Sequence, residues 1–102
     1  MGNGYLEEVY QESLELELTD QGIGFVVKPK LALCYKGRTL RKHYEADLIV
    51  LDKIVVELKA VKSLAPEHEA QLINYLKTTG RKVGYLVNFG AYPRLDWRRR
   101  VC

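Results

Sequence analysis

Charged side chains interrupt two segments that otherwise have the apolar composition of buried strands. Asp47 lies in the segment 44–51, and Glu57 and Lys59 lie in the segment 54–61. Side chains two positions apart on a strand share a face, so Glu57 and Lys59 point the same way. Because a charge in an apolar strand is costly unless something pairs with it, these three residues are the first candidates for chemistry.

The short connection between the two segments predicts a hairpin, and the length of its loop decides which residue faces Asp47. A tight two-residue loop at 52–53 would place Asp47 opposite Leu58, on the wrong face. A three-residue loop, or one bulge near Ala46, would place it opposite Glu57. We predict the latter arrangement, with both carboxylates on one face.

Two converging carboxylates with a lysine beside them suit a hard divalent cation such as Mg²⁺ or Mn²⁺, which prefers oxygen ligands. A bound cation of this kind neutralises charge that develops on a phosphoryl group. The lysine can orient the attacking water or stabilise the transition state. The alternative is a structural ion pair between Lys59 and Asp47 or Glu57, and the spacing alone leaves both interpretations open.

A helix over residues 4–19 precedes these strands. Its apolar residues are spaced three and four apart, as on one helical face; they are Leu6, Val9, Tyr10, Leu14 and Leu18. Glu7 lies along the edge of this apolar stripe, where a carboxylate is costly unless something pairs with it. Glu7 therefore joins the candidate residues.

The remaining pattern predicts the other strands and a second helix. Its turn residues and apolar runs indicate strands over 24–33 and 40–51, a helix that opens at 63–67 and stops at Gly80, a strand over 82–88 and a short edge strand over 95–101. With the strand over 54–61, the core order is αβββαβ. This order predicts an α/β fold with a mixed central sheet flanked by helices.

Length and composition restrict the class of protein. The chain has 102 residues, enough for one domain, which we take to span residues 1–102. It is 47% hydrophobic and 28% charged, which excludes disordered and collagen-like chains. Without a membrane-length apolar run or a leader pattern, we expect a cytoplasmic protein with no membrane association. Cys34 and Cys102 match no metal or redox spacing, so we expect free thiols.

Charge is distributed unevenly along the chain. The net charge is +3, yet the first 20 residues carry six acids and no base. Basic residues gather in 36–42, 77–82 and 94–100. This asymmetry favours an anionic partner for part of the surface, although ordinary solubilising charge would also explain it.

The combination of motifs resembles the PD-(D/E)xK nuclease superfamily. Asp47 followed after a hairpin by Glu57-Leu58-Lys59 resembles its core motif, with Ala46 where a proline usually stands. Residues 4–10 read G-x-x-E-x-x-Y, the signature of the GxxExxY family within that superfamily. Further blocks of that family resemble residues 47–50, 71–76 and 84–90. The resemblance covers roughly residues 4–101 and implies a restriction-endonuclease-like fold.

The resemblance also implies roles for individual residues. Asp47 and Glu57 would bind Mg²⁺ or Mn²⁺, with Glu7 as an additional acid and the backbone carbonyl of Leu58 as a further ligand. Lys59 would be the catalytic lysine. Gln71 would orient the attacking water, although it could instead cap a backbone group.

The same resemblance predicts a nuclease that acts on DNA, with structured or branched DNA as a candidate substrate. Candidate nucleic-acid contacts are Tyr75, Arg98, Arg99, Arg100 and Lys42. Tyr75 could instead be a core residue, and one of the three arginines is expected to point inward or pair with an acid. A homodimer would present two sites to two strands. The alternative functions are a non-catalytic nucleic-acid-binding module and a protein-interaction module on the same fold.

Overall fold

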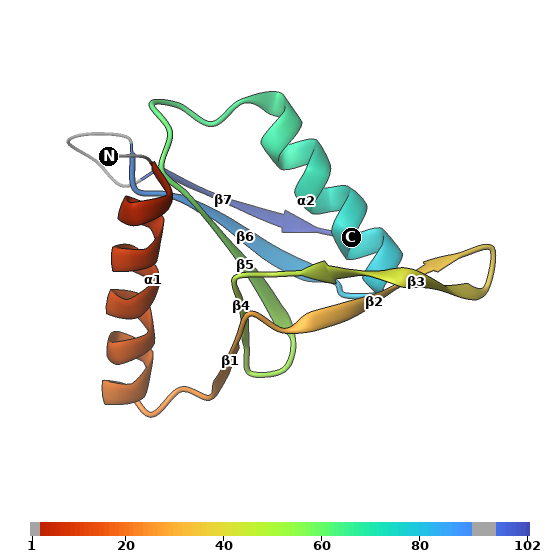
Figure 1. The fold of residues 1–102 in the computed structure, drawn as a ribbon, viewed down its shortest axis with the longest axis horizontal. Helices are drawn as coiled ribbons and strands as arrows, with labels where there is room; N and C mark the ends of the chain where they lie inside the picture. The colour runs from red at the N-terminus through yellow and green to blue at the C-terminus, as the bar shows by residue number, and fades with distance from the viewer. Residues whose placement is uncertain (1–2, 91–95) are drawn as a thin grey trace.

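The computed structural model describes residues 3–90 and 96–102, with side chains from residue 7 onward (Figure 1). The elements in chain order are α1 (Asn3–Asp20), β1 (Phe25–Val27), β2 (Lys30–Tyr35), β3 (Arg38–Glu45), β4 (Leu48–Val50), β5 (Ile54–Lys59), α2 (Pro66–Thr79), β6 (Val83–Asn88) and β7 (Asp96–Val101). The predicted α/β class and the αβββαβ core order are confirmed.

Five of the strands form one mixed sheet in the order β1-β4-β5-β6-β7. Only β5 and β6 pair in parallel, and the other neighbours pair antiparallel. The parallel pair needs a crossover, and α2 supplies it. Strands β2 and β3 pair with each other in a separate two-stranded sheet.

This second sheet arises because two predicted strands break at the same place. The strand expected over 24–33 is divided at Lys28 and Pro29, and the strand expected over 40–51 is divided at Ala46 and Asp47. Proline has no N–H to donate to a sheet, and Lys28 adopts a left-handed φ of 47°. Lys28 N donates to Asp47 O at 2.9 Å, and Ala46 N donates to Pro29 O at 3.2 Å. These two bonds hold the corner together, and Asp47 lies within it.

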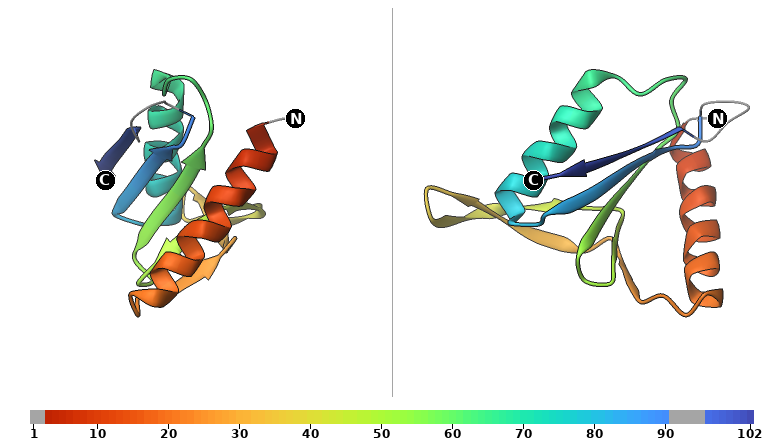
Figure 2. Two further views of the ribbon diagram at one scale, coloured as in Figure 1. Left: turned by 90° about the vertical axis from the view of Figure 1, so that its left-hand side faces the viewer. Right: turned by 180° about the vertical axis from the view of Figure 1, so that it is seen from behind.

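The helices cover opposite faces of the main sheet (Figure 2). On one face α2 contributes Leu72 and Leu76 to a buried cluster that includes Val55 of β5 and Leu86 of β6. On the other face, Leu14 and Leu18 of α1 pack against a second buried cluster, made by Leu48, Val56 and Leu58. Since neighbouring residues on β5 face opposite helices, Glu57 and Lys59 face α2.

The face that α1 buries differs from the predicted stripe at two positions. Val9, expected in the stripe, is 44% exposed, whereas Gln11 is only 7% exposed. Gln11 tolerates burial because its Nε2 donates a hydrogen bond to Asp47 O at 3.3 Å. Tyr10 is placed as expected, and its ring stacks on Phe89 with centroids 4.1 Å apart. This contact puts the amino-terminal half of α1 beside the carboxyl end of β6.

Two smaller predictions are confirmed, the end of α2 at Gly80 and the two free cysteines. Helix α2 ends at Thr79, followed by Gly80 at a φ of 75°, which only glycine adopts without strain. Cys34 and Cys102 are both exposed and free. Among the described residues, no helix is long and apolar enough to span a membrane.

The carboxyl end of β5 is fixed by contacts with the end of β6. Asn88 is fully buried; its side chain donates to Val61 O at 2.8 Å and accepts from Val61 N at 2.9 Å and from Gly90 N at 3.0 Å. Gly90 approaches so closely that a Cβ there would lie 2.4 Å from Val61 N and O. The segment that follows Lys59 therefore has little room to move.

Replacement of Gly90 tests this packing. Gly90→Ala would force backbone apart, and overpacking of this kind costs about 1–3 kcal/mol of unfolding free energy. Gly24→Ala is the matched control, because a Cβ at Gly24 meets no atom within 4 Å. Urea unfolding followed by circular dichroism compares the two variants, and equal stabilities would contradict the close approach.

Candidate active site

Asp47 and Glu57 meet as cross-strand neighbours. Val50 pairs with Ile54, so the loop between β4 and β5 has three residues, as predicted. Asp47 N donates to Glu57 Oε1 at 3.1 Å, and Leu58 N donates to Asp47 Oδ2 at 2.7 Å. Each carboxylate is thus oriented by a backbone N–H that binds one of its two oxygens.

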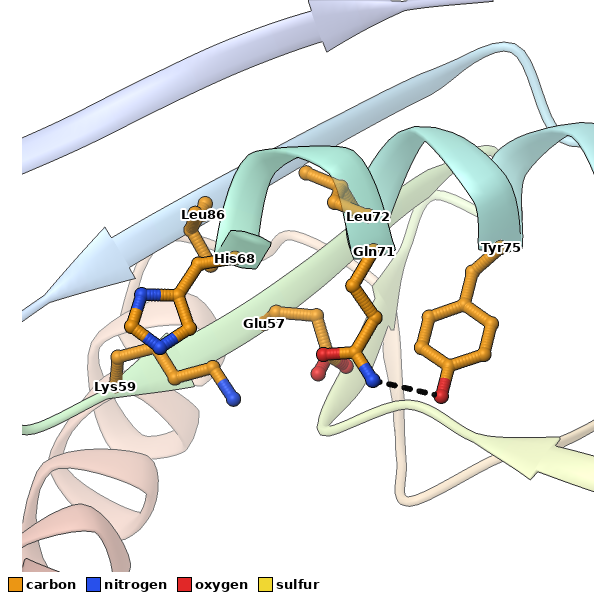
Figure 3. Close-up of a pocket in the computed structure, with 7 residues that line it drawn as sticks. All are labelled: Glu57, Lys59, His68, Gln71, Leu72, Tyr75 and Leu86. Carbon is orange, nitrogen blue, oxygen red and sulfur yellow. Dashed lines mark hydrogen bonds between the residues drawn. The ribbon is translucent and has the colours of Figure 1, made fainter. Parts of the chain in front are cut away.

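Lys59 lies on the same face of β5 as Glu57 (Figure 3). A structural ion pair would require its ammonium within 4 Å of a carboxylate oxygen of Asp47 or Glu57. In the part of the chain that the structure describes, Lys59 makes neither pair. The ion pair that a purely structural role of Lys59 would require is therefore not observed among the described residues.

A small cavity separates β5 from α2. Its volume is about 10 Å³, roughly the space that one water molecule needs. It is lined by Glu57, Lys59, His68, Gln71, Leu72, Tyr75 and Leu86. Figure 3 shows the polar side chains of α2 extending over Glu57 and Lys59, so groups from two elements converge on one space.

Burial and like charge act together on Glu57. Burial raises its pKa, and the nearby carboxylate of Asp47 raises it further, while Tyr44 and Lys59 act in the opposite direction. The net effect raises the pKa of Glu57 from 4.5 to about 7. The pair therefore carries more negative charge than its surroundings neutralise, which is typical of functional sites.

Tyr44 forms part of this environment, although the sequence analysis did not select it. Its ring stacks on Tyr75 with centroids 3.7 Å apart and planes at 13°. Its hydroxyl is buried without a hydrogen-bond partner among the described residues. Burial raises the pKa of Tyr44, and the charges of Glu57 and Asp47 raise it further. The position three residues before Asp47 was the available signal, but an aromatic residue on a strand usually indicates packing alone.

Gln71 and Tyr75 act together on α2. Gln71 Nε2 donates to Tyr75 Oη at 3.1 Å, and both side chains line the cavity (Figure 3). Gln71 makes no hydrogen bond to a backbone group in the described part of the chain, so the capping alternative is not observed. Tyr75 packs against the core and also reaches the cavity, which combines the two interpretations considered for it.

His68 is a second cavity residue that the sequence analysis did not select. Its Nδ1 accepts a hydrogen bond from Ala65 N at 3.0 Å, so this side chain also caps the start of α2. Because Nδ1 is the acceptor, the ring proton lies on Nε2. The spacing of His68 and Gln71, one helical turn apart, was the available signal.

Glu7 is half-buried on α1, one turn before Gln11. Among residues 3–90 and 96–102, no three His, Cys, Asp or Glu side chains lie close enough together to hold a metal ion. The predicted convergence of Glu7 with Asp47 and Glu57 is therefore not present in this structure. Instead, the side chain of Gln11 on α1 contacts Asp47 by donating a hydrogen bond to the backbone carbonyl of Asp47.

The three arginines of β7 separate by strand alternation. Arg98 and Arg100 face α2, where both form ion pairs with Glu69. Arg98 also pairs with Asp96. Arg99 is exposed on the other face. Two of the three arginines predicted to contact phosphates, Arg98 and Arg100, are thus paired with acids of this chain. The sequence analysis expected one such arginine.

The remaining donors suit a hard divalent cation. Asp47 and Glu57 each bind a backbone N–H through one oxygen, which leaves further lone pairs on both carboxylates. In a strand the N–H and C=O of one residue point to the same side, so the Leu58 carbonyl faces Asp47, as its N–H does. Oxygen ligands of this kind are the ones that Mg²⁺ and Mn²⁺ prefer.

Comparison with known proteins relates the chain to a nuclease superfamily. A family model described as the PD-(D/E)XK nuclease superfamily matches residues 1–100, whereas no curated protein matches the chain. The solved structure of SSO0001 aligns with a TM-score of 0.70 and 22% identity over 94% of this chain and 50% of that one. An alkaline exonuclease from Laribacter hongkongensis aligns with a TM-score of 0.64 and 14% identity over 92% of this chain and 55% of that one.

The chain spans about half the length of these two structures. At sequence identities this low, the structural alignments establish the shared fold alone. The family model, in contrast, covers nearly the whole chain and includes Asp47, Glu57 and Lys59. On this match, the chain belongs to the PD-(D/E)XK nuclease superfamily.

Proposed function

We propose that this chain is a Mg²⁺- or Mn²⁺-dependent nuclease that hydrolyses phosphodiester bonds in DNA. The observation that carries the proposal is the pair of oriented carboxylates, Asp47 and Glu57, beside a lysine, Lys59, that makes no ion pair with a described residue and lines the same cavity as Glu57. Family membership supports the reaction class. Within the superfamily, the G-x-x-E-x-x-Y signature at residues 4–10 supports placement in the GxxExxY family.

Asp47, Glu57 and the carbonyl of Leu58 would hold the cation. When bound, it would neutralise charge on the scissile phosphate and make a water molecule more acidic. Glu7 remains a candidate further ligand, because Gln11, one turn later on α1, already contacts Asp47. The donor set consists entirely of oxygen atoms, which favours Mg²⁺ or Mn²⁺ over softer metals.

Side chains from β5 and α2, on the two sides of the cavity, would bind the attacking water and the phosphate. Lys59 places its ammonium where it can donate hydrogen bonds to the attacking water or to a phosphoryl oxygen. Gln71 uses its amide nitrogen on Tyr75, which leaves its amide oxygen to accept a hydrogen bond from the same water. Tyr44 stacks on Tyr75, which lines the cavity together with Glu57.

The substrate part of the proposal rests on surface charge and on size. Exposed Arg99 and Lys42 are available for phosphates, whereas Arg98 and Arg100 support α2. We propose contact with phosphates and DNA shape rather than with base sequence, and structured or branched DNA as the substrate class. A homodimer that presents two sites would suit a branched substrate.

Replacement of the lysine tests the assigned chemistry. Lys59→Met keeps the length of the side chain but removes its charge, and loss of one transition-state donor costs about 10²–10³ in rate. Lys53→Met is the matched control, because Lys53 lies in the exposed β4–β5 loop. The measurement is cleavage of labelled branched and single-stranded DNA with Mn²⁺. Equal rates for wild type and Lys59→Met would contradict the proposal, and binding without cleavage by wild type would favour the non-catalytic module.

The raised pKa of Glu57 predicts a pH dependence of stability without metal. The unfolded chain loses the Glu57 proton near pH 4.5 and the folded chain near pH 7, so unfolding free energy falls between these values and is level above pH 7. The total fall is about 3 kcal/mol at about 1.4 kcal/mol per pH unit. Glu57→Gln removes this titration and with it the fall.

Thermal unfolding in EDTA from pH 4 to 8 measures this dependence. Wild type should lose stability relative to Glu57→Gln as the pH rises, and the exposed-site control Glu67→Gln should follow wild type. Parallel curves for wild type and Glu57→Gln would show that Glu57 ionises normally in the fold.

A further inference from the structure

The two-stranded sheet of β2 and β3, residues 30–45, forms a ribbon that extends away from the main sheet (Figures 1 and 2). It carries five basic residues and one acid; the basic residues are Lys30, Lys36, Arg38, Arg41 and Lys42. All five are exposed. The ribbon is therefore a strongly basic projection on a chain whose net charge is only +3.

The ribbon contributes little to the core. Only Leu31 and Tyr44 of the ribbon are buried, and both lie near its base. Towards the tip, Tyr35 and Leu40 are exposed. An isolated two-stranded hairpin is marginally stable at best. The length of the ribbon is therefore not explained by a contribution to the stability of the fold.

Within the described residues, the five basic side chains of the ribbon have no acidic partner; Lys36 lies over the ring of Tyr35 at 5.4 Å. By contrast, three arginines outside the ribbon, Arg81, Arg98 and Arg100, are all paired with acids. The ribbon therefore presents positive charge that is free for a partner.

The pairing of β2 with β3 is irregular at the position of two basic residues, Arg41 and Lys42. Ala32 pairs with His43 and Cys34 pairs with Thr39, so residues 40–42 lie opposite Leu33 alone. Bulges of this kind redirect side chains and increase the local twist. Arg41 and Lys42 both lie in the bulged stretch.

The base of the ribbon adjoins the candidate active site. Tyr44 stacks on Tyr75, which lines the cavity, and Asp47 follows the last ribbon residue by two positions. The Lys28–Asp47 and Ala46–Pro29 backbone bonds fix the direction in which the ribbon leaves. A nucleic acid held along the ribbon would therefore lie next to Asp47 and Glu57.

We propose that the ribbon enters the major groove of duplex DNA and contacts the phosphates that border it, so that the substrate contains a duplex next to the bond that is cut. The major groove of B-DNA is about 12 Å wide and admits a two-stranded ribbon. The major groove of duplex RNA is too narrow for side chains to read, and a single strand has no groove. The duplex requirement at the cut rests on the proposed function, whereas duplex binding does not.

Fluorescence anisotropy in EDTA tests the binding directly. The probes are a labelled DNA duplex of about two helical turns, about 20 base pairs, the RNA duplex of the same sequence and the single DNA strand. The variant Arg41→Ser/Lys42→Ser removes two ribbon charges. The control Lys53→Ser/Lys82→Ser removes two exposed charges beside a hollow at the opposite end of β5 and β6.

Wild type should bind the DNA duplex at least tenfold more tightly than either other probe. The ribbon variant should lose at least tenfold in affinity for it, and the slope of log affinity against log salt should fall by about 2, at about 0.9 per phosphate contact. The control variant should keep affinity close to wild type. Equal binding of the three probes, or equal losses in the two variants, would overturn the proposal.

Cleavage assays keep this result separate from the proposed function. Duplex binding that depends on the ribbon, without cleavage in Mn²⁺, would overturn the nuclease proposal and support the ribbon as a duplex-binding element. Cleavage of single strands at undiminished rate by the ribbon variant, with no preference of wild type for duplex DNA, would overturn the ribbon proposal and leave the nuclease intact.

Discussion

The structure depends on one reciprocal contact between two strands. The backbone N–H of Asp47 binds the Glu57 carboxylate, and the backbone N–H of Leu58 binds the Asp47 carboxylate. Charge-assisted bonds of this kind orient both acids without a cation. The three-residue loop sets the register that makes these bonds. The corner at Lys28 and Pro29 holds Asp47 immediately before β4.

The same contact has a cost, because it brings two carboxylates together in a poorly solvated place. Burial and the charge of Asp47 raise the pKa of Glu57 to about 7, and Lys59 compensates only in part. Buried Asn88 and the close approach of Gly90 to Val61 hold the neighbouring backbone in place. A rigid frame around uncompensated charge is the arrangement expected where a cation and a phosphate bind, since function often opposes stability at such sites.

The sequence was informative where local patterns decide the structure. Strand alternation and loop length predicted the pairing of Asp47 with Glu57, and Gly80 predicted the end of α2. The sequence was less informative where distant contacts decide. Lysine is not a residue type that signals a left-handed φ, yet Lys28 adopts one. The burial of Gln11 in place of Val9 depends on the carbonyl of Asp47, which is 36 residues away in the sequence. Tyr44 was missed because its role arises from the packing of α2 over the strands.

The most direct test of the central claim is thermal unfolding of wild type and Asp47→Asn/Glu57→Gln across a Mn²⁺ titration at constant pH, with EDTA as the zero point. The account predicts that Mn²⁺ stabilises wild type, by about 2.7 kcal/mol at a hundredfold excess over Kd, and leaves the double variant unchanged. Equal shifts in both proteins would mean that Mn²⁺ binds elsewhere. No shift in wild type, together with a large loss of stability in the double variant, would mean that the two acids are structural.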